Sequence, residues 1–142
     1  MSTVDTATLP VVAAREALGG TVLAVDDETG AARLRFVPCT KHNNLAGTVF
    51  GGYLASMIDD AAGIATWFGG GRRPFATAQM SVSFLRAAKA QEPLIADVDV
   101  SFTGTRQAFV EVRVSREDGN EMVAIGNVVQ SFLENKSAND RK

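Results

Sequence analysis

The stretch "GGYLASMIDDAAGIATWF", from Gly51 to Phe68, decides the fold of this chain. Its apolar residues lie on every side of a helical projection, and its only charges are the adjacent acids Asp59 and Asp60. A helix that is hydrophobic all round is a buried helix. We therefore expect one long helix that the rest of the chain covers.

The segments on either side of this helix predict β-strands. "TVLAVDDETGAARLRFVP" is typical of a hairpin, with strands at 21–26 and 32–37 and a turn at "DDETG". After the helix, four segments alternate apolar and polar residues; in the first, Met80 shares one face with other apolar residues and Thr77 lies on the opposite face. This order predicts an α+β fold, in which an antiparallel sheet of five or six strands curls about the central helix.

The chain divides into three parts. Residues 1–19 are an N-terminal segment whose first eight residues we expect to be disordered, followed by a short helix from Pro10 to Leu18 that stops at two glycines. Residues 20–133 form the domain, and residues 134–142 are a polar tail. A chain of 142 residues is long enough for one domain with a sizeable core.

Composition narrows the classes of function. The net charge of −2 offers no basic excess for nucleic acid, and no apolar run reaches the roughly 20 residues that span a bilayer. The N-terminus lacks the pattern of a secretory signal. A single cysteine, Cys39, excludes an intrachain disulfide and favours a reducing compartment, so we expect the cytoplasm. Cys39 and His42 have no second Cys or His with which to complete a zinc site.

The two acids of the helix differ in their neighbours. Aspartate is almost never fully buried without a partner, and no Lys or Arg lies within the helix. Each acid therefore has a partner from elsewhere, faces a cavity, or lies on a side of the helix that emerges into solvent. The helical neighbours of Asp59 are small and leave room for a ligand: Gly52, Ala55, Ser56, Ala62, Gly63 and Thr66. Those of Asp60 are mostly bulky: Tyr53, Met57, Ile64 and Trp67. Asp59 is the better catalytic candidate, and Asp60 has the pattern of a structural residue.

The start of the helix carries a second candidate. Free backbone N–H groups at a helix N-terminus favour developing negative charge, and the glycines Gly51 and Gly52 would let a substrate carbonyl approach closely. Gly51 and Asp59 are eight residues apart, which is about 12 Å along a helix. One carbonyl carbon cannot contact both groups of the same chain. If both act on one substrate, the site must combine two subunits.

The segment "HNNLAGTVFGGYLASMIDDAAGIA" resembles hotdog-fold acyl-CoA thioesterases of the phenylacetyl-CoA thioesterase-like (PaaI-like) group. Their usual pattern is an Asn, a Gly, then His-Gly-Gly, then an acid eight residues after the first of those glycines. The resemblance covers roughly residues 20–133. It implies hydrolysis of an acyl-CoA thioester without a cofactor beyond the coenzyme A of the substrate, in a homodimer or a dimer of dimers with sites at the dimer interface.

The resemblance also implies residue roles. Gly51 matches the glycine whose N–H polarises the thioester carbonyl, and Asp59 matches the acid that acts as nucleophile or general base. Asn44 matches a loop residue that holds the thioester or the water, and Thr77 matches a residue that orients the acid. Gly52 and Phe50 would adjoin the substrate. Cations are expected to hold the phosphates of coenzyme A, and the candidates are Arg72, Arg73, Arg86 and Lys89.

The chain departs from the family pattern at Phe50, where the family usually has His. This departure keeps open a non-catalytic acyl-CoA-binding protein. A hotdog hydratase or dehydratase is a further alternative, although such enzymes pair a His with the acid and His42 does not match that position. The acyl group is not specified, because the larger residues near the acids fit a pocket or a core equally well: Phe50, Tyr53, Met57 and Trp67.

Overall fold

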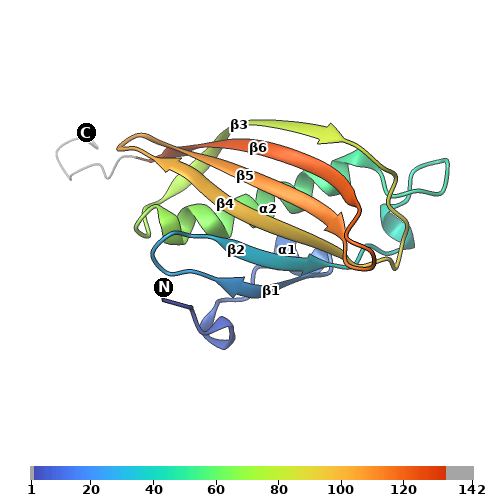
Figure 1. Ribbon diagram of the computed structural model, residues 1–142, viewed down its shortest axis with the longest axis horizontal. Coiled ribbons are helices and arrows are strands. Elements are labelled where there is room, and N and C mark those ends of the chain that lie inside the picture. Colours follow the sequence, from blue (N-terminus) through green and yellow to red (C-terminus); the bar gives the residue numbers. More distant parts are fainter. Residues whose placement is uncertain (1, 134–142) are drawn as a thin grey trace, which may run out of the picture.

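The computed structural model describes residues 2–133 and wraps one antiparallel sheet of six strands around the long helix α2 (Gly51–Gly69) (Figure 1). The strands are β1 (Gly20–Val25), β2 (Ala32–Phe36), β3 (Phe75–Phe84), β4 (Leu94–Thr103), β5 (Gln107–Arg116) and β6 (Met122–Phe132). Their order across the sheet is β1-β2-β4-β5-β6-β3. This arrangement confirms the predicted α+β hotdog fold. The predicted tail, 134–142, lies outside the described residues.

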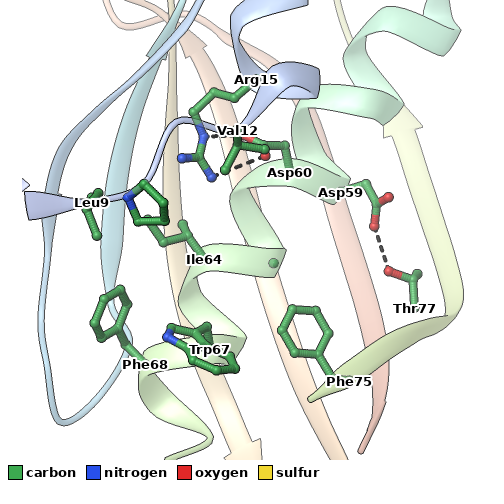
Figure 2. Close-up of a pocket in the computed structure, with 12 residues that line it drawn as sticks. Leu9, Val12, Arg15, Asp59, Asp60, Ile64, Trp67, Phe68, Phe75 and Thr77 are labelled. Carbon is green, nitrogen blue, oxygen red and sulfur yellow. Dashed lines mark hydrogen bonds and ion pairs between the residues drawn. The ribbon is translucent and has the colours of Figure 1, made fainter. Parts of the chain in front are cut away.

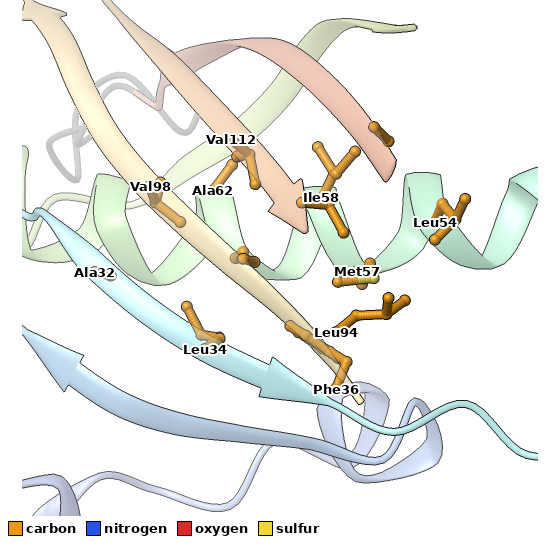
Figure 3. Close-up of a cluster of buried hydrophobic side chains, with 14 of the residues drawn as sticks. Ala32, Leu34, Phe36, Leu54, Met57, Ile58, Ala62, Leu94, Val98 and Val112 are labelled. Atoms are coloured by element: carbon orange, nitrogen blue, oxygen red, sulfur yellow. The ribbon is translucent and has the colours of Figure 1, made fainter. Parts of the chain in front are cut away.

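One face of α2 supplies the centre of the core. The helix begins after Phe50, whose backbone is extended, and ends at Gly69 before two further glycines. Its inner residues Leu54, Met57 and Ile58 are buried and belong to one hydrophobic core cluster with Leu94 and Val112 of the sheet (Figure 3). Burial of an aliphatic side chain stabilises a fold by about 1.5–3 kcal/mol. The apolar face therefore fixes how α2 is rotated, and its remaining face carries the two acids.

The helix and the sheet approach each other closely at Gly126 of β6. A Cβ atom at this position would lie 2.6 Å from Cγ2 of Ile58, which is closer than two carbon atoms can pack. Glycine is therefore favoured here, because a side chain would force Ile58 or the helix to shift.

The hairpin β1–β2 has the predicted turn. Oδ1 of Asp26 accepts hydrogen bonds from the backbone N–H groups of Glu28 (3.0 Å) and Thr29 (2.8 Å). The N–H of Thr29 is the main cause that holds the pKa of Asp26 below its usual range. The acid at the head of "DDETG" thus closes the turn as an acceptor, the role for which Asp is favoured in such positions.

The N-terminal segment differs from the prediction. Residues 2–8 are ordered against the hairpin: Thr3 forms a β-bridge with Asp26, and the N–H of Val4 donates to the carbonyl of Val25 at 3.0 Å. The predicted helix from Pro10 to Leu18 is reduced to α1 (Ala13–Ala17). Val12 is extended at the start of α1, as suits a β-branched residue.

Tyr53 ties this segment to α2. Its hydroxyl donates to the carbonyl of Leu18, and its ring is fully buried. Burial raises the pKa of Tyr53 above its ordinary range, so the hydroxyl keeps the proton that it donates. Within residues 2–133, no helix combines the length and the apolar character that crossing a membrane requires.

We expect Gly126→Ala to lower the free energy of unfolding by about 1–3 kcal/mol, because the added methyl overpacks the contact with Ile58. Gly63→Ala is the matched control: its Cβ would lie 3.7 Å from the nearest atom of Phe75, and a helical Gly→Ala change gains about 0.5–1 kcal/mol. Urea unfolding of both variants measures the difference. Equal losses at the two glycines would contradict the close approach at β6.

Candidate active site

Asp59 lies on the outer face of α2, opposite the core. Its Oδ1 accepts a hydrogen bond of 2.7 Å from the hydroxyl of Thr77 on β3 (Figure 2). Within residues 2–133 its other oxygen, Oδ2, accepts no hydrogen bond, and the side chain is exposed. The structure therefore brings together the two residues that the family resemblance linked, and one carboxylate oxygen remains available to a ligand.

A β-bulge makes this contact possible. In β3 the register with β6 shifts between Thr77 and Gln79, so that Thr77 pairs with the buried Gln130 while Met80 pairs with the buried Val128. Strict alternation would have placed Thr77 on the face opposite Met80, as the sequence predicted. The bulge turns Thr77 to the helix side, and this re-aiming of a side chain is typical of bulges next to functional sites.

Asp60 has a different environment. Its two oxygens accept a bidentate pair of hydrogen bonds from Arg15 of α1, at 2.7 Å from Nε and 3.2 Å from Nη2. Both side chains are only 11% exposed. The partner comes from outside α2, as predicted, and Asp60 fixes the N-terminal segment on the helix.

A cavity of about 420 Å³ opens beside the two acids. Asp59 and Thr77 stand on one side of it, and the N-terminal segment stands on the other (Figure 2). Between them, Trp67 and Phe75 contribute aromatic surface. The cavity thus joins a carboxylate to an apolar chamber, which is the usual composition of a small-molecule site.

The helix start lies away from this cavity. The N–H groups of Gly51 and Gly52 donate to no acceptor within the described part of the chain, and both residues are exposed. The ring of Phe50 packs over Gly52, where a Cβ would meet it at 2.5 Å. Because α2 is one unbroken helix, Gly51 and Asp59 are about 12 Å apart along its axis. A single chain does not bring these two groups together.

Asn44 is also outside the cavity. Its side-chain oxygen accepts from the N–H groups of Ala46 (3.0 Å) and Thr48 (3.1 Å), and its amide donates to the hydroxyl of Thr48. These bonds shape the loop before α2. The predicted contact of Asn44 with a thioester or a water stays a prediction.

The three predicted arginines all have partners within the chain and do not line the cavity. Arg72 pairs with Asp27, and Arg86 pairs with Glu121 at 3.2 Å. Arg73 donates to three backbone carbonyls, and its guanidinium lies 3.7 Å from the ring centre of Phe132. Arg73 therefore fastens two loops together. The role of these cations toward coenzyme A stays a prediction.

The structure adds residues that the sequence did not indicate. The sequence predicts a partner for Asp60 from outside the helix but does not identify it as Arg15, and no sequence pattern marks Phe75 as a lining residue. Of the four ambiguous large residues, Tyr53 and Met57 belong to the core, and Trp67 lines the cavity. The signal for Trp67 was its position two helical turns after Asp60, on the same stripe of the helix.

A profile of the thioesterase superfamily matches residues 46–123, which include α2 and three strands of the sheet. The chain belongs to the thioesterase superfamily. No curated protein sequence matches this superfamily member at a significant level.

Solved structures of other proteins share its fold. The PaaI protein of E. coli, from the phenylacetic acid degradation operon, aligns with a TM-score of 0.80 at 21% identity over 88% of this chain and 87% of its own. A variant of the phenylacetic acid degradation protein PaaI from Thermus thermophilus aligns with a TM-score of 0.75 at 26% identity, over 84% and 97% of the two chains. A hypothetical thioesterase of Streptococcus pneumoniae, solved with coenzyme A, aligns with a TM-score of 0.74 at 18% identity, over 83% and 88%. These matches confirm the resemblance to PaaI-like hotdog thioesterases.

We expect Asp60→Asn to lower the free energy of unfolding by about 1–3 kcal/mol, because it leaves the Arg15 guanidinium without its counter-charge. Asp59→Asn should have little effect, since an amide oxygen still accepts from Thr77. Urea unfolding measures both, and Arg15→Met combined with Asp60→Asn should cost less than the sum of the single changes. Additive costs, or a larger loss at Asp59 than at Asp60, would refute the structural assignment of Asp60.

Proposed function

We propose that this member of the thioesterase superfamily hydrolyses an acyl-CoA thioester to the free acid and coenzyme A. One observation carries the proposal: a carboxylate, held at 2.7 Å by a neutral hydroxyl, stands beside an apolar cavity. The hydroxyl orients the carboxylate without neutralising its charge, so Asp59 can still accept a proton or attack a carbonyl carbon.

In the general-base form of the reaction, Asp59 takes a proton from a water molecule whose oxygen adds to the thioester carbonyl carbon. The carbon–sulfur bond then breaks, the acid departs, and the thiolate of coenzyme A takes up the proton. In the nucleophilic form, Oδ2 of Asp59 adds to the carbonyl carbon, the carbon–sulfur bond breaks, and the thiolate of coenzyme A departs. Water then hydrolyses the resulting mixed anhydride, which releases the acid, restores the Asp59 carboxylate and supplies the proton that the thiolate takes up. Both forms need the free oxygen of Asp59 and a fixed orientation, which Thr77 supplies in either case.

Either form also needs a donor for the oxyanion. The N–H of Gly51 has no acceptor among the described residues, but it lies about 12 Å along α2 from Asp59 of its own chain. We infer that the donor comes from a second copy of the chain. The strand β3 is an edge of the sheet and mostly exposed, and an unpaired edge is a template for pairing with another chain.

The proposed homodimer therefore pairs at β3, next to Thr77. A dimer of dimers would extend this assembly.

Coenzyme A is the proposed carrier of the acyl group. The streptococcal structure that was solved with coenzyme A shares the fold of this chain, which supports the same carrier here. Arg72, Arg73 and Arg86 each have a partner in the chain, whereas Lys89 forms no ion pair within residues 2–133. Among the four cations, Lys89 is thus the freest to meet a phosphate.

A non-catalytic acyl-CoA-binding protein is the second candidate. The observation that favours it is Phe50, which stands where the family pattern has His and whose ring covers Gly52. A hydratase is less consistent with the geometry, because His42 packs on Tyr53 at a ring distance of 4.3 Å and does not line the cavity with Asp59.

We expect Asp59→Asn to lower kcat for acyl-CoA hydrolysis by at least about 10²-fold, the scale of a lost general base, while acyl-CoA binding is retained. Thr77→Val should reduce kcat less than Asp59→Asn does, and Thr77→Ser should restore most of the loss, since it keeps the hydroxyl. Release of free thiol measures turnover, and calorimetry measures binding. If the wild type binds acyl-CoA as tightly as Asp59→Asn does but hydrolyses none of it, the non-catalytic candidate is favoured.

The shared site predicts complementation between subunits. Gly51→Pro removes one N–H, and it suits the first position of a helix whose preceding residue, Phe50, already has the extended backbone (φ −70°, ψ 150°) that proline demands. Homodimers of Gly51→Pro and of Asp59→Asn should be nearly inactive. Heterodimers isolated with two tags should recover about half of the wild-type activity, because one of their two sites receives neither defect. Folded heterodimers without activity would rule out the shared site.

A further inference from the structure

The cavity beside Asp59 has a wall that is separate from the sheet and from α2. Leu9, Pro10 and Val12 line it from the N-terminal segment, facing Trp67 and Phe75 across the opening (Figure 2). This segment precedes the first strand and lies outside residues 46–123, which the superfamily profile matches. The chamber is therefore completed by a part of the chain that the family pattern does not specify.

This wall is fixed to the rest of the molecule at both ends. Arg15 binds Asp60 through two hydrogen bonds of 2.7 and 3.2 Å, and the carbonyl of Leu18 accepts from the buried Tyr53. At the other end, the N–H of Val4 bonds to Val25 at 3.0 Å, and Leu9 packs on the core. A segment held in this way presents a defined surface to a ligand.

The chemistry of the lining indicates what kind of ligand fits. Apart from the two acids, Arg15 and Thr77, the lining is apolar. The one cation, Arg15, is already neutralised by Asp60. A carboxylate at the end of a ligand's acyl group would meet two acids and no free cation in this chamber. Burying such a carboxylate without a partner would be costly. The chamber suits an uncharged apolar group.

We propose that residues 9–15 form the distal wall of the acyl-binding site and set the length of an uncharged acyl chain, with Val12 as a specificity-determining residue. This inference rests on the proposed thioesterase function, because it places the thioester at Asp59. From Asp59 to Trp67, α2 rises about 12 Å, and the chamber lies along this stretch. The acyl chain runs from the carboxylate across the outer face of α2 and ends against the wall on the opposite side of the chamber (Figure 2).

Val12 and its neighbour Val11 make a matched test. Val12 lines the chamber and is 37% exposed, whereas Val11 is 77% exposed and does not line it. Val12→Phe should lower kcat/KM for decanoyl-CoA relative to butanoyl-CoA by at least about tenfold, the scale on which an apolar pocket rejects an extra methylene. Val11→Phe should leave this ratio unchanged, and Val12→Ala should raise it. Equal shifts in the two Phe variants, or an equal loss for both substrates, would overturn the proposal.

A second comparison tests the charge of the chamber. Pentanoyl-CoA and glutaryl-CoA have acyl chains of equal length, but the glutaryl chain ends in a carboxylate. The wild type should hydrolyse glutaryl-CoA at least about tenfold more slowly, since the unpaired carboxylate must be desolvated. Asp60→Asn, which frees the charge of Arg15, should narrow the gap. Equal rates for the two substrates in the wild type would contradict an uncharged ligand.

A binding measurement separates this proposal from the proposed function. Calorimetry of butanoyl-CoA and decanoyl-CoA with Asp59→Asn, alone and combined with Val12→Phe or Val11→Phe, reports on the wall without turnover. If the wild type hydrolyses none of the thioesters but Val12→Phe weakens decanoyl-CoA binding selectively, the function fails and the wall stands. If hydrolysis is rapid and its length preference ignores Val12, the wall fails and the function stands.

Discussion

The burial of α2 against the sheet is the interaction on which the rest of this structure depends. A helix with apolar residues all round is stable in water only when other elements cover it. The sheet covers one face, with Ile58 packed closely against Gly126. This buried apolar face fixes the rotation of the helix, and the rotation decides that Asp59 and Asp60 face outward. The two acids are therefore placed by packing that involves neither of them.

The same helix imposes a geometric constraint on chemistry. Gly51, at its first turn, offers a backbone N–H that has no acceptor within residues 2–133, and Asp59 lies about two turns further on. A straight α-helix keeps these groups apart at a fixed distance, and no side-chain rotation can close that distance. In the proposed homodimer, a second copy of the chain would remove the difficulty by bringing the start of one helix near the middle of the other. The exposed edge strand β3 adjoins Thr77, where such a copy would dock.

The main elements of the fold could be predicted from the sequence because they depend on local patterns. Periodicity and turn residues located α2, the hairpin and the four later strands, and helical neighbours separated Asp59 from Asp60. The contact between Asp59 and Thr77 could not be predicted from the alternation of residues, because a bulge in β3 reverses the alternation that the sequence shows. Bulges arise from how two strands meet, and single-strand patterns do not record them. Arg15 was missed for a similar reason: its partner is 45 residues away, and only the folded chain brings the pair together.

The backbone of the N-terminal segment meets the hairpin through the bridge between Thr3 and Asp26, the bond from Val4 to Val25 and the bond from Asp27 to Ser2, and Val12 takes part in none of them. Substitutions at positions such as Val12 therefore leave the hydrogen bonds of the sheet and the hydroxyl beside Asp59 unaltered. In evolutionary terms, the two parts of the site can diverge independently. A lineage could change the acyl group that it accepts through a handful of substitutions before the first strand, while selection holds the helix constant. Relatives grouped by the helix motif would then share a reaction but accept different acyl groups.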